Sequence, residues 1–152
     1  MKIKNILCPT DFSDISNNAI PWAISLASTH HARLWLLHVV DQLHGIEQYQ
    51  ILTLTPQEIA ETMLTRAKAE LSKIAGKIKN DIKVEIAAKQ GKAFVEIIKT
   101  AKEQDIDLIV IGSHGRTGLS NVLIGSVAEK VSRKAPCPVL IVRGKDNLFE
   151  MP

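Results

Sequence analysis

The chain of 152 residues has only two cysteines, Cys8 and Cys137, and no large excess of charge of either sign. In a reducing compartment two isolated cysteines predict thiols in the core, with a disulfide or a metal site as the alternative. The net charge of +3 comes from interspersed acids and bases, which is too weak a pattern to predict nucleic-acid binding. The composition therefore disfavours both a disulfide-rich scaffold and a nucleic-acid-binding protein.

Long apolar runs are also missing. The longest, such as residues 34–37 and 108–111, are far shorter than the about 20 residues that a membrane-spanning helix needs. The first eight residues are basic and then apolar, as in a leader, but Pro9, Thr10 and Asp11 interrupt the apolar stretch. We therefore expect no signal peptide, no membrane segment and a cytoplasmic protein.

Strand-like and helix-like segments alternate along the chain, without a repeat or a linker. We predict strands at residues 3–8, 34–40, 82–89, 107–112 and 139–142. We predict helices at residues 13–31, 55–79 and 127–135, and a further one that opens at Gly91. Pro21 should kink the first helix or delay its start. This order predicts a single three-layer α/β/α sandwich around a mainly parallel five-stranded sheet.

The most informative motif is a glycine loop after the fourth predicted strand. Gly112 and Gly115 follow that strand, and nine residues later Gly125 and Ser126 precede a helix. Glycines let the backbone approach an anion and adopt positive φ, and free N–H groups at a helix start point at negative charge. Ser126 stands where an N-cap is expected, so it could cap the helix and contact phosphate. The loop predicts nucleotide binding, although the glycines could serve only a turn and close packing.

Several known phosphate-binding motifs are absent. No lysine stands between Gly125 and Ser126, so the loop is not a Walker A motif. The dinucleotide G-x-G-x-x-G fingerprint belongs after a first strand, where this chain has residues 8–11, Cys-Pro-Thr-Asp, and no Ser-Gly-Gly run of an ATP pyrophosphatase is found. A phosphoacceptor receiver domain needs an aspartate after the third strand, where residues 89–91 are Lys-Gln-Gly.

A second loop of chemical interest follows the first predicted strand and contains Pro9, Thr10 and Asp11. Ligands of open parallel sheets bind beyond the carboxyl ends of the strands, at a switch point in the strand order. If strands one and four are neighbours, this loop and the glycine loop line one crevice. The Asp11 carboxylate could accept a hydrogen bond from a ribose hydroxyl, or it could only cap the following helix.

Taken together, these residues resemble the universal stress protein family over nearly the whole chain. The resemblance is carried by residues 6–13, Ile-Leu-Cys-Pro-Thr-Asp-Phe-Ser; 36–40, Leu-Leu-His-Val-Val; 109–116, Ile-Val-Ile-Gly-Ser-His-Gly-Arg; 123–127, Leu-Ile-Gly-Ser-Val; and 137–142, Cys-Pro-Val-Leu-Ile-Val. The ATP-binding branch of the family carries glycine, two residues, glycine, nine residues, glycine and then serine or threonine. This chain matches that pattern in full.

The resemblance implies a parallel sheet in strand order 3-2-1-4-5, with the switch point between strands one and four. It implies a domain over residues 1–144, followed by a polar tail over residues 145–152. ATP is the implied ligand, with ADP or AMP as further candidates, and Mg²⁺ or Mn²⁺ would be held through the phosphates. Asp11 matches the acidic residue near the ribose or adenine, and the Val39 backbone matches the adenine contact. The implied site comprises Pro9, Thr10, Asp11, Val39, Gly112, His114, Gly115, Arg116, Gly125, Ser126 and Val127.

We do not expect an enzyme, because a nucleophile needs a base within reach and a third group that orients the base. The family, which the chain resembles, binds ATP and hydrolyses it slowly or not at all. We expect a stress-response module whose conformation or partner choice depends on ATP. The alternatives are a slow metal-assisted ATPase, or a dimeric interaction module in which ATP only stabilises the fold. The last apolar strand, Cys137 to Arg143, is expected to pair two chains as a homodimer, as is common in the family.

Overall fold

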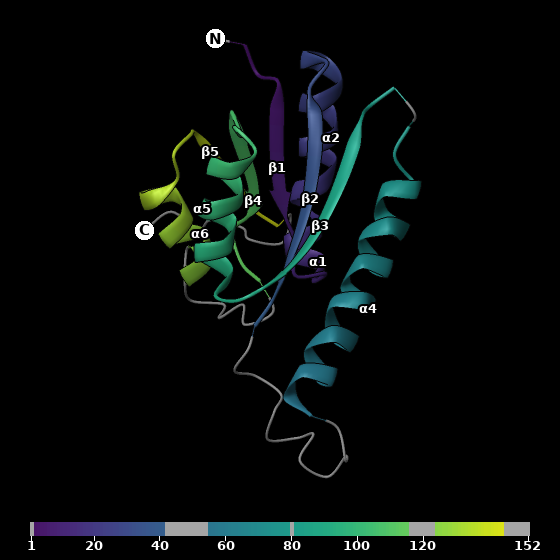
Figure 1. Cartoon of the computed structure of the whole chain (residues 1–152). Helices are drawn as coiled ribbons and strands as arrows, with labels where there is room; N and C mark the ends of the chain where they lie inside the picture. The colour runs from purple at the N-terminus through teal and green to yellow at the C-terminus, as the bar shows by residue number, and fades with distance from the viewer. Residues whose placement is uncertain (1, 42–54, 80, 116–123, 145–152) are drawn as a thin grey trace.

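The computed structural model describes residues 2–41, 55–79, 81–115 and 124–144. Its five strands form one parallel sheet in the order β3-β2-β1-β4-β5 (Figure 1). The strands are β1 (Asn5–Pro9), β2 (Arg33–Val40), β3 (Val84–Gln90), β4 (Leu108–Gly112) and β5 (Val139–Val142). The predicted fold class and strand order are confirmed. The third strand begins two residues later than predicted, because Ile82 packs into the core before the strand starts.

Helices cover both faces of the sheet. They are α1 (Asp14–Asn17), α2 (Ala19–His30), α4 (Pro56–Gly76), α5 (Ala93–Glu103) and α6 (Ser126–Lys134). Side chains of α2 and α4 form one buried cluster with the sheet, and those of α5 and α6 form another on the opposite face. None of the described helices is long and apolar enough to cross a membrane. The arrangement is the predicted three-layer α/β/α sandwich.

The first predicted helix is divided in two at Asn18, between α1 and α2. Pro21 is the third residue of α2, where a missing N–H costs no helical hydrogen bond. The predicted late start is therefore found. The helix predicted to open at Gly91 instead starts at Ala93, because Gly91 adopts a φ of 148° and lies outside the helix.

The long helix α4 starts where the sequence predicts a capping box. The Thr55 hydroxyl accepts a hydrogen bond from the Glu58 N–H at 3.2 Å, and the Glu58 carboxylate accepts one from the Thr55 N–H at 2.7 Å. Pro56 occupies the first turn, where it suits the fixed φ of proline. Hydrogen bonding to the carboxylate, first from the Thr55 N–H and then from the Thr55 side chain, lowers the pKa of the exposed Glu58 carboxyl.

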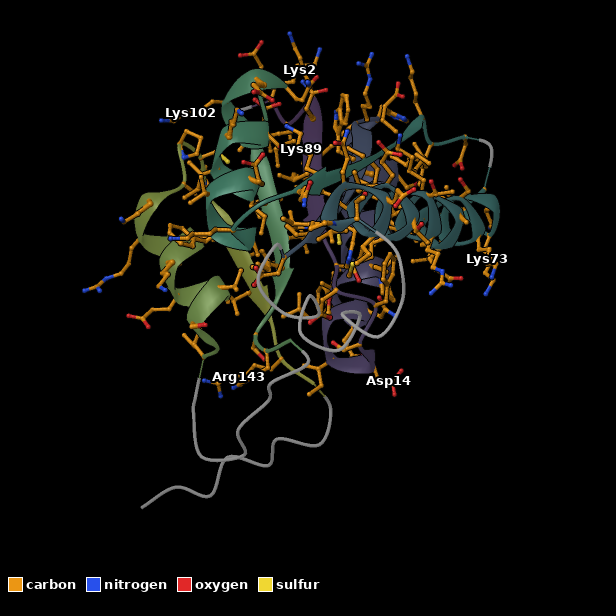
Figure 2. The ribbon with its side chains drawn as sticks, turned by 60° about the horizontal axis from the view of Figure 1, so that its bottom comes forward. Lys2, Asp14, Lys73, Lys89, Lys102 and Arg143 are labelled. Carbon is orange, nitrogen blue, oxygen red and sulfur yellow. The ribbon has the colours of Figure 1, made fainter. Side chains whose placement is uncertain are left out.

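All strands point the same way, so their amino ends lie at one end of the sheet and their carboxyl ends at the other. Figure 2 shows Lys2, which precedes β1, at one end of the molecule, and Asp14 and Arg143, which follow β1 and β5, at the opposite end. The two predicted functional loops follow β1 and β4, and therefore lie at the carboxyl ends of the strands.

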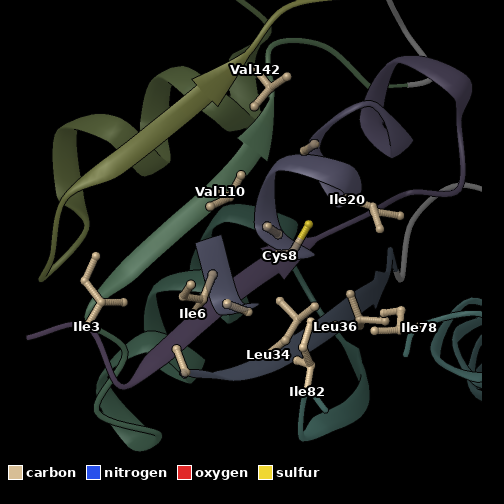
Figure 3. Close-up of a cluster of buried hydrophobic side chains, with 14 of the residues drawn as sticks. Ile3, Ile6, Cys8, Ile20, Leu34, Leu36, Ile78, Ile82, Val110 and Val142 are labelled. Atoms are coloured by element: carbon tan, nitrogen blue, oxygen red, sulfur yellow. The ribbon is translucent and has the colours of Figure 1, made fainter. Parts of the chain in front are cut away.

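The core beneath these loops includes Cys8, whose side chain lies among Ile6, Leu36 and other apolar groups (Figure 3). Cys8 is fully buried, and this burial raises the pKa of its thiol to about 12. Cys137 is partly exposed, and burial together with the negative charge of Asp107 raises the pKa of its thiol. Both cysteines are free thiols.

We expect the two thiols to differ strongly in reactivity toward an aromatic disulfide reagent at mildly alkaline pH. Cys137 should react in the native protein, whereas Cys8 should react only as fast as the chain unfolds, because its thiolate is both inaccessible and disfavoured. Absorbance of the released thiol, with Cys137→Ser and Cys8→Ala as matched variants, measures each rate. Equal native-state rates for both cysteines would contradict the packing of Cys8.

Candidate functional site

The candidate site lies where the loops after β1 and β4 meet, at the centre of the sheet. These two strands are neighbours, and the chain leaves them toward opposite faces, into α1 and α2 after β1 and into α6 after β4. A Cβ added to Gly115 would collide with the Asp11 carboxylate. The structure thus brings together the two loops that the sequence analysis singled out.

A compact hydrogen-bond network holds the loop after β1. The Thr10 hydroxyl donates to the Asn17 side-chain oxygen at 2.8 Å and accepts from the Phe12 N–H at 2.9 Å. The Ser16 hydroxyl donates to Thr10 Oγ1 at 3.1 Å and accepts from the Asp11 N–H, also at 3.1 Å. Thr10 and Ser16 are both buried. The Thr10 side chain therefore shapes the loop, while its backbone carries the chain past the end of β1.

The Asp11 carboxylate is half-buried and oriented by its neighbours. Its Oδ1 atom accepts hydrogen bonds from the Ser13 hydroxyl at 2.6 Å and from the Ser13 N–H at 3.0 Å. Ser13, not Asp11, caps α1, because its hydroxyl accepts from the Ser16 N–H at 3.2 Å. The alternative that Asp11 only caps a helix is therefore wrong, because Ser13 is the cap residue. Asp11 acts on the cap through Ser13, and its Oδ2 atom faces Gly115.

Phe12 and His38 join this loop to the end of β2. Phe12 has a φ of 67°, a left-handed conformation that is rare for a bulky residue. Its ring stacks on the His38 imidazole, with centroids 4.3 Å apart and planes 21° from parallel. His38 Nδ1 lies 2.8 Å from the Thr10 carbonyl oxygen. Sequence reasoning gave neither residue a role in the site, and no sequence signal indicates a positive φ at a phenylalanine.

The backbone of Val39 lies just beyond the end of β1. The Leu37 carbonyl accepts from the Thr10 N–H at 2.9 Å, so the backbone polar groups of Leu37 face β1. Backbone direction alternates along a strand, and those of Val39 therefore face the same side, past the last residue of β1. The Val40 carbonyl faces the other way and accepts from the Gly91 N–H. The Val39 N–H and C=O thus face the side of β2 on which β1 lies, past the end of β1.

Three described glycines at the loop after β4 serve through the absence of a side chain, not through unusual backbone angles. Gly112, Gly115 and Gly125 all have negative or extended φ, so the expected positive φ is wrong at these three positions. A Cβ at Gly112 would lie 2.8 Å from the Ser16 Cα, and one at Gly125 would lie 3.2 Å from the Ser113 carbonyl oxygen. Gly112 lets α1 approach β4, and Gly125 lets α6 approach the loop.

The start of α6 differs from the prediction by one residue. Gly125, with φ −67° and ψ 156°, is the N-cap, and Ser126 is the first helical residue. The expected cap at Ser126 is therefore wrong, since the extended residue before a helix is the cap. The N-cap residue is a glycine, so within the part of the chain that the structure describes no side chain caps the first turn of α6, which begins with Ser126 and Val127. The N–H groups of such a turn, together with the helix dipole, favour an anion.

Ser113 and His114 hold the glycine loop in place. The Ser113 N–H donates to the Val142 carbonyl on β5 at 2.7 Å, and the Gly125 N–H donates to the Ser113 carbonyl at 2.7 Å. Ser113 Oγ lies 3.0 Å from His114 Nδ1, and both side chains are buried. The His114 ring therefore positions the loop. Arg116 lies outside the described residues, and so do residues 42–54, whose sequence has no clear period and predicts a loop.

In the described ranges, no three histidine, cysteine or acidic side chains gather as metal ligands would. Acceptors and donors of a different kind are present: a carboxylate at Asp11, strand-end amides at Val39 and helix-start amides at Ser126 and Val127. These groups suit, in order, a hydroxyl, a heterocyclic base and a phosphate.

A doubly wound parallel sheet with two loops meeting at its switch point places the chain among the open α/β proteins, which bind ligands at that point. The sequence model of the universal stress protein family matches residues 2–143. Universal stress protein MJ0531 of Methanocaldococcus jannaschii is 33% identical over 145 residues, which cover 92% of this chain and 82% of that relative. The chain therefore belongs to the universal stress protein family.

Solved structures of the family show the same fold. Universal stress protein UspA from Lactobacillus plantarum has a TM-score of 0.81 and 28% identity, covering 94% of this chain and 99% of UspA. A universal stress protein solved in complex with cAMP has a TM-score of 0.62 and 25% identity, covering 94% of this chain and 98% of the other.

Proposed function

We propose that this chain is an ATP-binding universal stress protein whose conformation or partner choice depends on the bound nucleotide, with little or no hydrolysis. The observation that carries the proposal is the start of α6, whose N-cap residue, Gly125, has no side chain and closes the glycine pattern of the ATP-binding branch. Phosphates bound there would take the place of the missing cap. The cAMP complex of a related protein supports a nucleotide as the class of ligand.

The other groups of the site fit the rest of the nucleotide. Asp11 would accept a hydrogen bond from a ribose hydroxyl through the carboxylate oxygen that Ser13 does not use. The Val39 N–H and C=O would pair with the adenine edge, which needs one donor and one acceptor in line. Pro9, Thr10, Gly112, Gly115 and His114 would shape the loops around these contacts, and Arg116 would add charge near the phosphates. Mg²⁺ or Mn²⁺ would be held through the phosphates.

The described groups favour binding over hydrolysis. Hydrolysis needs a base that activates a positioned water. Asp11 Oδ1 already accepts two hydrogen bonds from Ser13, and His114 Nδ1 is engaged with Ser113. Both candidate bases thus serve the structure of their own loops. Phosphate release as fast as in ordinary enzymes, about one turnover per second or more, would contradict this part of the proposal.

Dimerisation through β5 is the second part of the proposal. The Pro138 and Val142 carbonyls accept hydrogen bonds from β4 and its following loop, so the backbone groups of Val139 and Ile141 face the outer edge of the sheet. Such an edge favours pairing with a second chain. The free thiols agree with a cytoplasmic location. The match over residues 2–143 supports a domain over residues 1–144, with residues 145–152 as a tail.

Sedimentation velocity in the presence of ATP, ADP or no nucleotide tests whether the nucleotide is a switch. We expect the oligomeric state or its dissociation constant to change between ATP and ADP. If the same dimer forms in all three conditions, and ATP only raises the melting temperature, ATP is a structural ligand and the interaction-module alternative replaces the switch. Ile141→Pro removes an outward N–H and serves as the edge-blocked control.

A further inference from the structure

The amino ends of the strands, opposite the candidate site, border an open depression of about 480 Å³, which we call the amino-end depression. It is formed where β1, β2 and β3 begin, three adjacent strands of the sheet. Because all strands are parallel, it lies at the other end of the molecule from the loops after β1 and β4, on the side of Lys2 in Figure 2. Its lining residues are Lys4, Asn5, His31, Ala32, Arg33, Asp81 and Lys83.

The amino-end depression has an excess of positive charge. Its lining contains three cationic side chains, Lys4, Arg33 and Lys83, against the single carboxylate of Asp81. The carboxylate of nearby Asp107 accepts hydrogen bonds from the Lys4 and Asn5 N–H groups at 2.7 and 2.9 Å, so backbone donors already compensate it.

The cations are only weakly neutralised by the protein. Within the described ranges, neither Arg33 nor Lys4 has a carboxylate oxygen within 4.0 Å of its side-chain nitrogens. Lys83 pairs with Glu85 at 3.4 Å, but this pair is solvent-exposed and such pairs contribute little. The Arg33 residue is half-buried, and its guanidinium has no ion-pair partner among the described residues.

The backbone beneath these side chains is firmly held. The Arg33 N–H donates to the Lys4 carbonyl at 2.8 Å, and the Leu34 N–H donates to the Lys83 carbonyl at 2.9 Å. His31 ends α2 in a left-handed conformation with φ 52°, which turns the chain directly into β2. Three strand starts in fixed register thus present their cations around one depression, and binding would need little ordering of the backbone.

We propose that the amino-end depression is a second anion site, which takes a small soluble ligand bearing a diphosphate or longer phosphate chain. A planar guanidinium can donate two parallel hydrogen bonds to phosphate oxygens, and the lysines add point charges around it. Three cations suit a ligand with several negative charges better than a single carboxylate. The volume lies within the range of about 300–1,000 Å³ that is typical of small-molecule sites.

Titration of the ¹⁵N-labelled full chain with sodium pyrophosphate, followed by amide chemical shifts, tests this site. We expect saturable shifts at Lys4, Ala32 and Lys83, beyond those produced by sodium chloride at matched ionic strength. Arg33→Gln should weaken this binding by about tenfold or more, because one bidentate charge-assisted contact is lost. Lys83→Gln should weaken it in the same direction, and it decides the matter if Arg33→Gln proves unfolded.

Lys73→Gln on α4 is the matched control, because Lys73 is an exposed lysine that pairs with Glu70 and does not line the amino-end depression. It should bind pyrophosphate as the wild type does. Shifts at the amino end that follow ionic strength alone, or that persist unchanged in both Arg33→Gln and Lys83→Gln, would overturn the proposal. Shifts at Gly112 and Ser126 report the separate candidate nucleotide site, so the two proposals succeed or fail independently.

Discussion

Replacing Ser126 with proline is expected to weaken ATP binding by about ten- to hundredfold without unfolding the protein, because it removes one N–H donor to phosphate. Ser126 is the first residue of α6, a position that favours proline, and no helical hydrogen bond uses its N–H. Gly125 before it is extended, with ψ 156°, as a residue before proline must be. Isothermal titration calorimetry measures the affinity, and circular dichroism verifies the fold.

Ser126→Ala is the matched control, because it removes the hydroxyl and keeps the N–H. Its affinity should lie between those of the wild type and Ser126→Pro, and the difference between the two variants isolates the backbone donor. If Ser126→Pro bound ATP as tightly as Ser126→Ala, the N-terminus of α6 would not hold phosphate. Valine at Gly125 would be a poorer test, because a Cβ there lies only 3.2 Å from the Ser113 carbonyl oxygen.

Gly112→Ala is expected to lower the free energy of unfolding by about 1–3 kcal/mol and to weaken ATP binding. The added Cβ would lie 2.8 Å from the Ser16 Cα and 3.0 Å from the Ile15 carbonyl oxygen, so α1 would have to move. Ser16 holds the Asp11 N–H through its hydroxyl, and the movement would therefore displace Asp11. Urea unfolding gives the stability, and ATP titration of the folded fraction gives the affinity.

Gly76→Ala provides the comparison, because a Cβ at Gly76, the last residue of α4, meets no atom within 4 Å. That variant should be neutral or more stable by up to about 1 kcal/mol, since alanine favours the helix over glycine. A loss of stability in Gly76→Ala as large as in Gly112→Ala would show that the cost at Gly112 does not come from the contact with α1.

Most helices and strands could be predicted from local sequence patterns. The start of α4 could be predicted because Thr55, Pro56 and Glu58 satisfy its first backbone donors among themselves. The resemblance supplied the strand order, which local patterns do not contain. The starts of β3 and α5 lie two residues later than predicted, because the packing of Ile82 and the turn at Gly91 determine where they begin.

The candidate site could be predicted in its position but only partly in its detail. The loops after β1 and β4 had to meet once these strands were neighbours. The role of each residue within the loops depends on tertiary contacts. Phe12 adopts positive φ to stack on His38, Ser13 takes over the helix cap from Asp11, and residues 124–125 lie against the loop that Ser113 and His114 hold. None of these contacts leaves a periodic or local pattern in the sequence.

Calorimetric titration of the purified full chain with ATP in the presence of Mg²⁺ tests whether the two loops form a nucleotide site. We expect saturable binding of one nucleotide per chain in the micromolar range, with affinity lost in Ser126→Pro. If the folded protein binds none of ATP, ADP and AMP, the proposed nucleotide site is wrong, and the glycine loop serves only to pack α1 and α6 against the sheet.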